Sequence, residues 1–135
     1  MLIIVDVSEP HRINGYDVVA KYCSKTICFD HHEDFGLEGC NAGILNPAAP
    51  STTAILFDLF GNVCTEFLEC ILTGILSDTQ NLTFNTNDVT VCTVRAIEKL
   101  GVDVKKFKKL VSMKDPRTVE LTKLALRRIT ESKFS

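Results

Sequence analysis

The sequence lacks any long hydrophobic run, and this absence bears on where the protein works. No apolar stretch approaches the roughly 18–20 residues that a bilayer-spanning helix needs. The first residues, Met1 to Asp6, also lack the basic segment that opens a secretory signal peptide, and they reach an aspartate too early for one. We therefore expect a cytoplasmic protein that has no membrane partner.

The 6 cysteines lack the spacing of a metal-binding ribbon. They contain no Cys-x-x-Cys pair, and the sequence has no His-x-x-x-His partner for them, which argues against a structural zinc site. Several stand in apolar surroundings, such as Cys28 between Ile27 and Phe29, and Cys70 before Ile71. Because a reduced cysteine behaves as a small hydrophobic residue, we expect reduced thiols in the core.

Basic residues are scarce in the first two thirds of the chain. Residues 1–92 hold 3 Lys and Arg against 12 Asp and Glu, whereas residues 93–135 hold 12 against 5. The sequence leaves two interpretations of the basic part open. Lys and Arg can simply solvate exposed helix faces. Alternatively, an acidic metal-binding half lies beside a basic half that attracts polyanions.

The 135 residues suffice for one domain with a single core, and their pattern indicates an α/β fold. Residues 2–5 and 25–29 are short apolar runs typical of buried parallel strands, and an aspartate follows each. A short helix within residues 15–23 would join them as a βαβ unit. Residues 33–50 contain three glycines and two prolines, so we expect them to be irregular.

The rest of the chain is expected to be helical. Ser51, directly after Pro50, is a good N-cap for the first of these helices, because a serine side chain can accept a hydrogen bond from the first helical turn. Apolar residues spaced by one, three and four then predict longer helices with one buried stripe. The expected ranges are 51–60, a helix from 62 or 65 to 76, 87–100, 104–111 and 119–129. The predicted fold is thus a short parallel sheet of two readable strands covered by about five to six helices.

Two strands alone would make a poor core. Both have the nearly continuous apolar character of strands covered on both faces, and parallel strands usually belong to larger sheets. We therefore expect the exposed sheet edge to be covered, either by an N-terminal part of the same protein or by a second copy of the chain.

Polar residues follow the predicted strands at the point where each strand ends. Asp6 ends the first strand, and Asp30, His31 and His32 come at the end of the second. Because ligands of parallel α/β sheets bind outside the carboxyl ends of the strands, Asp6 and His31 are expected on one edge. Carboxylate and imidazole ligands together suit ions such as manganese or zinc. Each residue also has a plainer interpretation, since strand-end aspartates often cap turns.

The order of these residues resembles the motif order of the DHH phosphoesterases. The motifs are Val5-Asp6, then Asp30-His31-His32, then Gly74-Ile75-Leu76-Ser77-Asp78-Thr79, and the likeness extends through Pro50-Ser51-Thr52-Thr53 to Val119–Ile129. The superfamily includes manganese-dependent inorganic pyrophosphatases, exopolyphosphatases, single-strand DNA exonucleases and oligoribonucleases that also dephosphorylate phosphoadenosine phosphate. The oligoribonuclease and pyrophosphatase branches are the most similar. Residues 1–112 would then be an incomplete DHH domain, and 113–135 a helix that resembles the start of the interdomain linker.

The resemblance implies a metal site. Asp6 matches the carboxylate that bridges two metal ions, and His31 and Asp78 match ligands of one of them. Mn²⁺ is the expected ion, with Mg²⁺, Co²⁺ or Zn²⁺ as options. Asp30 would orient the histidines, as imidazole ligands usually require.

Other residues are expected to contact the substrate phosphate. His32 resembles the histidine that has this role in the family, and Arg12 is a further candidate for a phosphate or structural contact. The helix that begins at Ser51 and Thr52 can offer backbone N–H donors to a phosphate. The neighbouring His11 has no role in the family and is expected to be exposed.

The implied function is two-metal hydrolysis of phosphate esters, with short oligonucleotides, nucleotide phosphates or pyrophosphate-like compounds as substrates. The sequence departs from the family in two places. It contains neither the first motif, His-x-x-x-Asp-x-Asp, nor the C-terminal substrate-binding domain. We therefore expect one metal ion at reduced affinity and little activity. A fragment or misassigned start of an active enzyme, a partner chain that supplies ligands, and a non-catalytic interaction or scaffold protein all fit this pattern.

Overall fold

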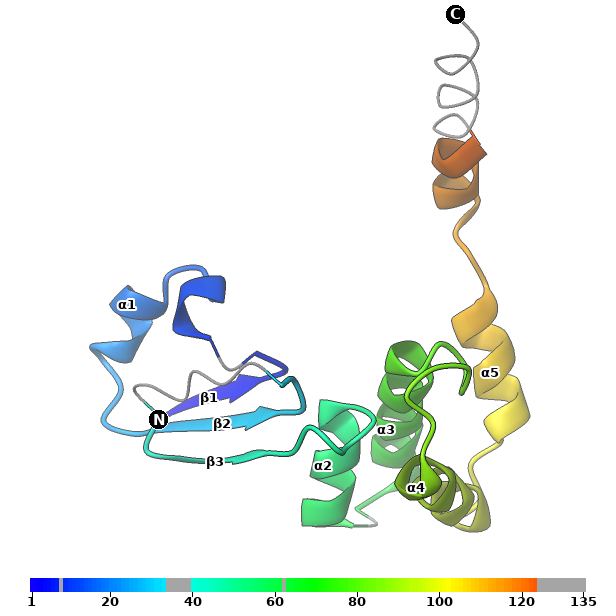
Figure 1. Ribbon diagram of the computed structural model, residues 1–135, viewed down its shortest axis with the longest axis horizontal. Helices are drawn as coiled ribbons and strands as arrows, with labels where there is room; N and C mark the ends of the chain where they lie inside the picture. The colour runs from blue at the N-terminus through cyan, green and yellow to red at the C-terminus, as the bar shows by residue number, and fades with distance from the viewer. Residues whose placement is uncertain (8, 34–39, 62, 124–135) are drawn as a thin grey trace, which may run out of the picture.

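The computed structural model describes residues 1–7, 9–33, 40–61 and 63–123 and has an α/β fold, as the sequence predicts (Figure 1). Its elements are β1 (Leu2–Val5), the 3-10 helix η1 (Pro10–Arg12), α1 (Tyr16–Ala20), β2 (Thr26–Asp30), β3 (Ala42–Leu45), α2 (Thr52–Phe60), α3 (Thr65–Asp78), α4 (Asp88–Lys99) and α5 (Val104–Ser112). Residues 116–123 are also helical, and the remainder of the predicted helix 119–129 lies outside the described residues. No helix in this part of the chain has the length and apolar content that crossing a bilayer requires.

The sheet is parallel and has the order β1-β2-β3. β3 corrects the prediction that residues 33–50 are irregular. Gly43, which the sequence suggested as a loop residue, pairs with Cys28 of β2. A Cβ at position 43 would clash with the backbone carbonyl of Cys28, so this glycine permits the close approach of the two strands.

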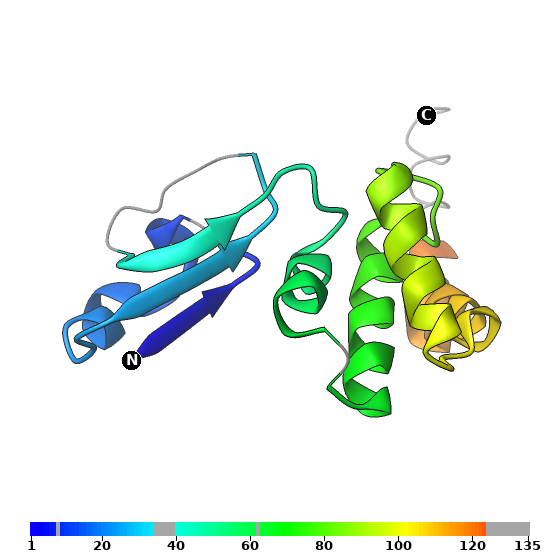
Figure 2. The ribbon, with the colours of Figure 1, turned by 90° about the horizontal axis from the view of Figure 1, so that it is seen from below.

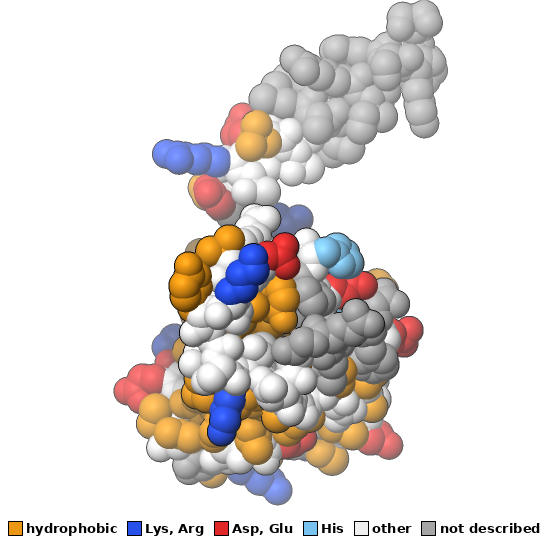
Figure 3. All heavy atoms as spheres, turned by 90° about the vertical axis from the view of Figure 1, so that its left-hand side faces the viewer, with side chains coloured by type: hydrophobic (Ala, Val, Ile, Leu, Met, Phe, Trp, Pro, Cys, Tyr) orange, Lys and Arg blue, Asp and Glu red, His pale blue; other side chains and the backbone are white. Residues whose placement is uncertain are grey.

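The sheet is thinly covered. Figure 1 shows η1 and α1 beside β1, while α2 to α5 gather beyond the carboxyl ends of the strands. Among the described residues β1 pairs only with β2, and its Ile3 and Val5 are 55% and 50% exposed. Val18 in α1 and Tyr22 after it are exposed as well, and hydrophobic side chains are visible over this end of the molecule (Figure 3). That a second chain or an N-terminal segment covers the edge stays a prediction.

The hydrophobic core lies instead among the helices (Figure 2). α3 contributes its apolar stripe to the centre and packs against α2, α4 and α5. At Gly74 of α3 an added Cβ would lie 2.5 Å from the side chain of Thr53, so α2 and α3 approach closely there. The core residues are Ala54, Leu68, Ile71, Leu72, Ile75, Leu76, Val94, Ile97, Val102 and Val104.

The predicted helix starts are confirmed by their caps. The Ser51 side chain accepts a hydrogen bond from the Ala54 backbone N–H (3.2 Å) and so caps α2. Asn87 caps α4 in a reciprocal arrangement with Thr90. Such caps satisfy backbone donors that the first helical turn leaves without partners.

The six cysteines are free, but the expectation of core cysteines holds for one of them. Cys28 is fully buried, and burial is the main reason why its pKa is raised to about 11. Cys70 is exposed, so its predicted core position is wrong. The buried stripe of α3 runs through Leu68, Ile71 and Leu72, and this spacing turns position 70 toward solvent.

Candidate metal site

Asp6 stands at the carboxyl end of β1 in a strained backbone conformation. Its φ is 63°, a left-handed value that is uncommon for a residue other than glycine. Its backbone N–H donates to the Phe29 carbonyl (2.9 Å), and its Oδ1 accepts a hydrogen bond from the Thr52 hydroxyl (2.8 Å). Strained residues that are held in this way concentrate at functional sites.

His31 brings the two predicted carboxylates together. Its Nε2 lies 3.6 Å from Asp6 Oδ1 and 3.7 Å from Asp78 Oδ2. Asp6 comes from the end of β1, His31 from the residue after β2, and Asp78 from the last position of α3. The His31 side chain is 14% exposed, whereas those of Asp6 and Asp78 are 56% and 36% exposed. The cluster therefore has an imidazole at its base and two carboxylates that reach solvent.

Asp30 orients the turn that carries the histidines. It is fully buried, and its Oδ1 accepts hydrogen bonds from the backbone N–H groups of His31 (2.8 Å) and His32 (3.3 Å). The same oxygen lies 2.7 Å from Nδ1 of the His32 ring. When the ring donates from Nδ1, its Nε2 stays available for an outside group.

His32 joins the cluster as well. Asp6, His31 and His32 each offer one possible metal-ligand atom, and these three atoms lie within 4.8 Å of one another. The centroids of the two imidazole rings are 4.6 Å apart. The resemblance assigns His32 to the substrate phosphate, and the geometry also permits it as a metal ligand. This is the one group of three metal-capable side chains found in the described part of the chain.

The two carboxylates of the cluster make a bound cation electrostatically favourable. Burial raises the pKa of Asp78, and the negative charge of Asp6 raises it further, while His31 and His32 act in the opposite direction. Two carboxylates beside one imidazole repel each other when both are ionised. A bound cation would relieve that repulsion.

A pocket of about 220 Å³ opens beside the cluster. Asp6, Thr52 and Asp78 contribute to its wall together with Ser77 and other neighbours. Ser51, by contrast, is buried, and its hydroxyl contacts the Thr53 hydroxyl (2.8 Å) in addition to capping α2. Of the two residues predicted at this helix start, Thr52 is therefore the one that contacts the site. Its role as a donor to Asp6 was missed, because no local pattern links residues 46 positions apart.

Arg12 lies apart from this cluster. Its recorded ion pair is with Glu9 (Nη1 to Oε2, 4.0 Å), which also lies 3.4 Å from Nε2 of the exposed His11. Within the described ranges Arg12 makes no ion pair with Asp6 or Asp78. A contact of Arg12 with phosphate stays a prediction.

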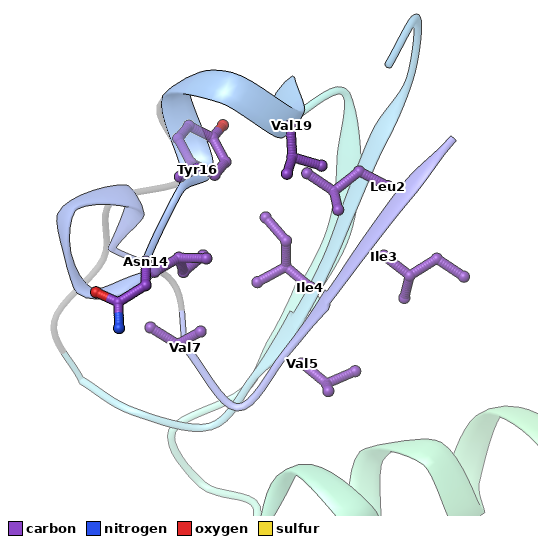
Figure 4. A pocket seen from close by; sticks show the side chains of 9 residues that line it. Leu2, Ile3, Ile4, Val5, Val7, Asn14, Tyr16 and Val19 are labelled. Carbon is purple, nitrogen blue, oxygen red and sulfur yellow. The ribbon is translucent and has the colours of Figure 1, made fainter. Parts of the chain in front are cut away.

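A second hollow, of about 250 Å³, lies between β1 and α1. Leu2, Ile4 and Val7 point into it from the side of β1, and Tyr16 and Val19 approach from α1 (Figure 4). Among the described residues, no charged side chain lines it. The hollow is suited to apolar contacts and offers no chemistry for a phosphate.

The comparisons with known proteins support the fold. No protein-family model matches this chain, and no curated protein matches it at a significant level. Among solved structures, the chain is similar to an exopolyphosphatase-related protein from Bacteroides fragilis, with a TM-score of 0.78 and 26% sequence identity. The match covers 93% of this chain and 40% of the other, so the chain spans less than half of that protein. The likeness supports the broad DHH-like phosphoesterase superfamily and a phosphoesterase-like fold, without distinguishing its branches.

Proposed function

We propose that Asp6, His31 and Asp78 hold a divalent cation, Mn²⁺ by preference, in a centre that hydrolyses phosphate esters. The observation that carries this proposal is the position of His31 Nε2, which lies 3.6 and 3.7 Å from the two carboxylates. Metal–ligand bonds of about 2.0–2.2 Å place two ligand atoms of one ion roughly 3–4 Å apart, so the distance from His31 to each carboxylate is one that two ligands of a shared ion have. The mixed nitrogen and oxygen donors suit Mn²⁺ and do not exclude Mg²⁺, Co²⁺ or Zn²⁺.

Neighbouring residues would prepare the site for this role. Thr52 fixes the Asp6 carboxylate through its hydrogen bond, and Asp30 fixes the His32 ring. With Nδ1–H donated to Asp30, a proton on Nε2 of His32 would donate to a phosphate oxygen at the mouth of the pocket. A bound ion would supply Lewis acidity and lower the pKa of a bound water.

The proposed substrates are short oligonucleotides, nucleotide phosphates or pyrophosphate-like compounds. The exopolyphosphatase-related neighbour supports this class, because it connects the fold with phosphate chemistry. Since the likeness covers 40% of that protein, substrate choice by the whole protein is part of the proposal. The described residues supply one cluster of ligands, which agrees with the low activity expected of residues 1–135 alone.

A hydrolysis assay with Mn²⁺ tests the proposal. Phosphate or nucleotide release would be measured from a labelled pentanucleotide, phosphoadenosine phosphate and pyrophosphate, with this chain and with any longer form that its coding sequence provides. We expect Mn²⁺-dependent turnover in the longer form, with losses of about 100-fold or more in His31→Ala and Asp78→Asn. His11→Ala, which alters an exposed histidine outside the cluster, is the matched control. No hydrolysis of any substrate by the longer form would rule the proposal out.

A non-catalytic interaction module is the second candidate. The exposed apolar side chains of β1 and α1, such as Ile3, Val5 and Val18, favour it because they offer a surface for another protein. Such a module would bind the metal without turnover, so the same assay distinguishes the two candidates.

A further inference from the structure

The backbone at Asp6 breaks the alternation of a regular strand. Successive side chains of a strand point to opposite faces, so a continued β1 would place Val7 on the same face as Val5. Figure 4 shows Val7 instead on the side of Ile4, which faces α1. The left-handed φ of 63° at Asp6 lies at this break. The conformation of Asp6 therefore sets the direction both of its own carboxylate and of the residue that follows.

This conformation of Asp6 depends on contacts that hold it. A residue other than glycine keeps a left-handed backbone only where its surroundings fix it, because its Cβ disfavours that region. The Asp6 backbone N–H donates to the Phe29 carbonyl (2.9 Å), and the Thr52 hydroxyl donates to Asp6 Oδ1 (2.8 Å). A third contact holds the next residue, where the Val7 carbonyl accepts a hydrogen bond from the Cys28 thiol (Sγ to O, 3.4 Å). Asp6 is thus fixed at its N–H, at its side chain and at the residue after it.

Cys28 makes its contact from the centre of the sheet. It lies in β2, the middle strand, and pairs with Ile4 of β1 and Gly43 of β3. Because neighbouring strand residues in register share a face, its fully buried side chain lies on the face of Ile4, to which Val7 also turns (Figure 4). The hydrogen bond links residues 21 positions apart. It therefore attaches the segment after Asp6 to the middle strand.

The thiol is suited to donate to this carbonyl. Burial is the largest of the effects that raise the pKa of Cys28 to about 11, and Cys40 and Asp30 act in the same direction. The sulfur therefore keeps its proton at neutral pH and remains a donor. A small apolar residue would fill the same space but would leave the Val7 carbonyl without this donor.

We propose that Cys28 is a positioning residue of the candidate metal site. Its thiol holds the Val7 carbonyl and thereby keeps Asp6 in the conformation that directs its carboxylate toward His31. Cys28 acts through Asp6 and is not a ligand itself. The inference rests on the proposed function for the ion, whereas the effect of Cys28 on the Asp6 backbone needs no ion.

Three variants separate the hydrogen bond from packing. Cys28→Ser retains a donor that reaches the carbonyl after a small shift, Cys28→Val fills the buried space without a donor, and Cys28→Ala lacks both. Isothermal titration with Mn²⁺ measures the affinity of each variant at a temperature at which circular dichroism shows it folded. Because Cys28 lies one residue away from the ligand, we expect Cys28→Val and Cys28→Ala to lose about threefold to tenfold in affinity. Cys28→Ser should stay within about twofold of the wild type, whereas a role in packing alone would make Cys28→Val the variant most similar to the wild type.

A measurement in EDTA examines the backbone without metal. Amide hydrogen exchange is followed at Asp6, whose N–H donates to Phe29, and at Ile4, two residues earlier in β1, as the reference. Relative to Ile4, exchange at Asp6 should be about threefold or more faster in Cys28→Val and close to the wild-type rate in Cys28→Ser. Val94→Ala, which removes buried side-chain atoms in α4, controls for a general loss of stability and should keep the Mn²⁺ affinity within about twofold.

Equal Mn²⁺ affinities of Cys28→Ser and Cys28→Val would overturn the inference, and so would a loss in Val94→Ala as large as that in Cys28→Val. If the wild type binds no Mn²⁺, the proposed function fails and the exchange rates decide alone. Faster exchange at Asp6 in Cys28→Val but not in Cys28→Ser then supports the role of Cys28, and equal rates refute it. If the wild type binds Mn²⁺ and both variants match it in affinity and exchange, the inference fails and the proposed function stands.

Discussion

The sheet half of the molecule (residues 1–51) and the helical half (α2 to α5) differ in how they bury hydrophobic residues. Among the described residues of the sheet half, the buried apolar side chains are Ile4, Cys28, Ala49 and Pro50, whereas the core cluster lies wholly in the helical half. Asp6 and His31 nevertheless come from the sheet half, and Thr52 and Asp78 come from the helical half. The candidate site thus lies at the junction between a weakly packed half and a well packed one. A metal bound there would connect them and stabilise the sheet half by mass action.

The largest effect should come from the core of the helical half. Leu72→Ala removes a fully buried side chain of α3, and we expect a loss of about 2–5 kcal/mol in the free energy of unfolding. Ile3→Ala, in β1, is the matched control, and because Ile3 is 55% exposed its loss should stay below about 1 kcal/mol. Urea denaturation followed by circular dichroism measures both. Equal losses would show that the sheet half is packed as tightly as the helices.

An intermediate effect is expected at the contact between the two halves. Thr52→Val removes the hydroxyl that donates to Asp6 and keeps the shape of the side chain. Because residues that orient a metal ligand typically contribute 10–100-fold in affinity, we expect Mn²⁺ binding to weaken by about that factor. Thr52→Ser retains a hydroxyl and should recover most of the affinity. If Thr52→Val bound Mn²⁺ like the wild type, the hydrogen bond to Asp6 would have no part in the site.

The smallest effect concerns the metal-free site. Because burial and the charge of Asp6 raise the pKa of Asp78, its protonated form favours the fold, and that contribution is lost as the pH rises through the raised pKa. Asp78→Asn removes this loss, so in EDTA at pH 7 its Tm should exceed that of the wild type by about 2 °C. Asp78 is partly exposed, and solvent keeps the effect small. At a pH below about 4, where the wild-type carboxyl is protonated as well, the two Tm values should converge. A lower Tm for Asp78→Asn at pH 7 would contradict this explanation.

The helical half could be predicted from the sequence because its signals are local. Ser51 and Asn87 are residue types that favour helix N-caps, and they stand at the starts of α2 and α4. The spacing of apolar residues in α3 identifies its buried face. β3 was not predicted because one of its four residues is Gly43, and a glycine usually indicates a loop. Its role as a strand residue follows only from its pairing with Cys28 of β2. The prediction for Cys70 was wrong because apolar sequence neighbours indicate burial, whereas its position on α3 lies outside the buried stripe.

The candidate site was predictable in part. Strand ends and motif order suggested Asp6, His31 and Asp78, and the structure places both carboxylates within 4 Å of the His31 Nε2 atom. The hydrogen bond from Thr52 to Asp6 could not be predicted, since it depends on how α2 docks against the end of β1. The left-handed conformation of Asp6 is likewise a product of the assembled fold. Long-range packing, which leaves no local pattern, accounts for both omissions.

The central claim is that one divalent cation binds where the two halves meet. Isothermal titration of the metal-free chain with Mn²⁺ tests it most directly, with His31→Ala beside the wild type and His11→Ala as the control. We expect one Mn²⁺ per chain for the wild type and for His11→Ala, and an affinity at least about 30-fold lower for His31→Ala, which loses the nitrogen between the two carboxylates. Absence of Mn²⁺ binding, or an unchanged affinity in His31→Ala, would contradict it.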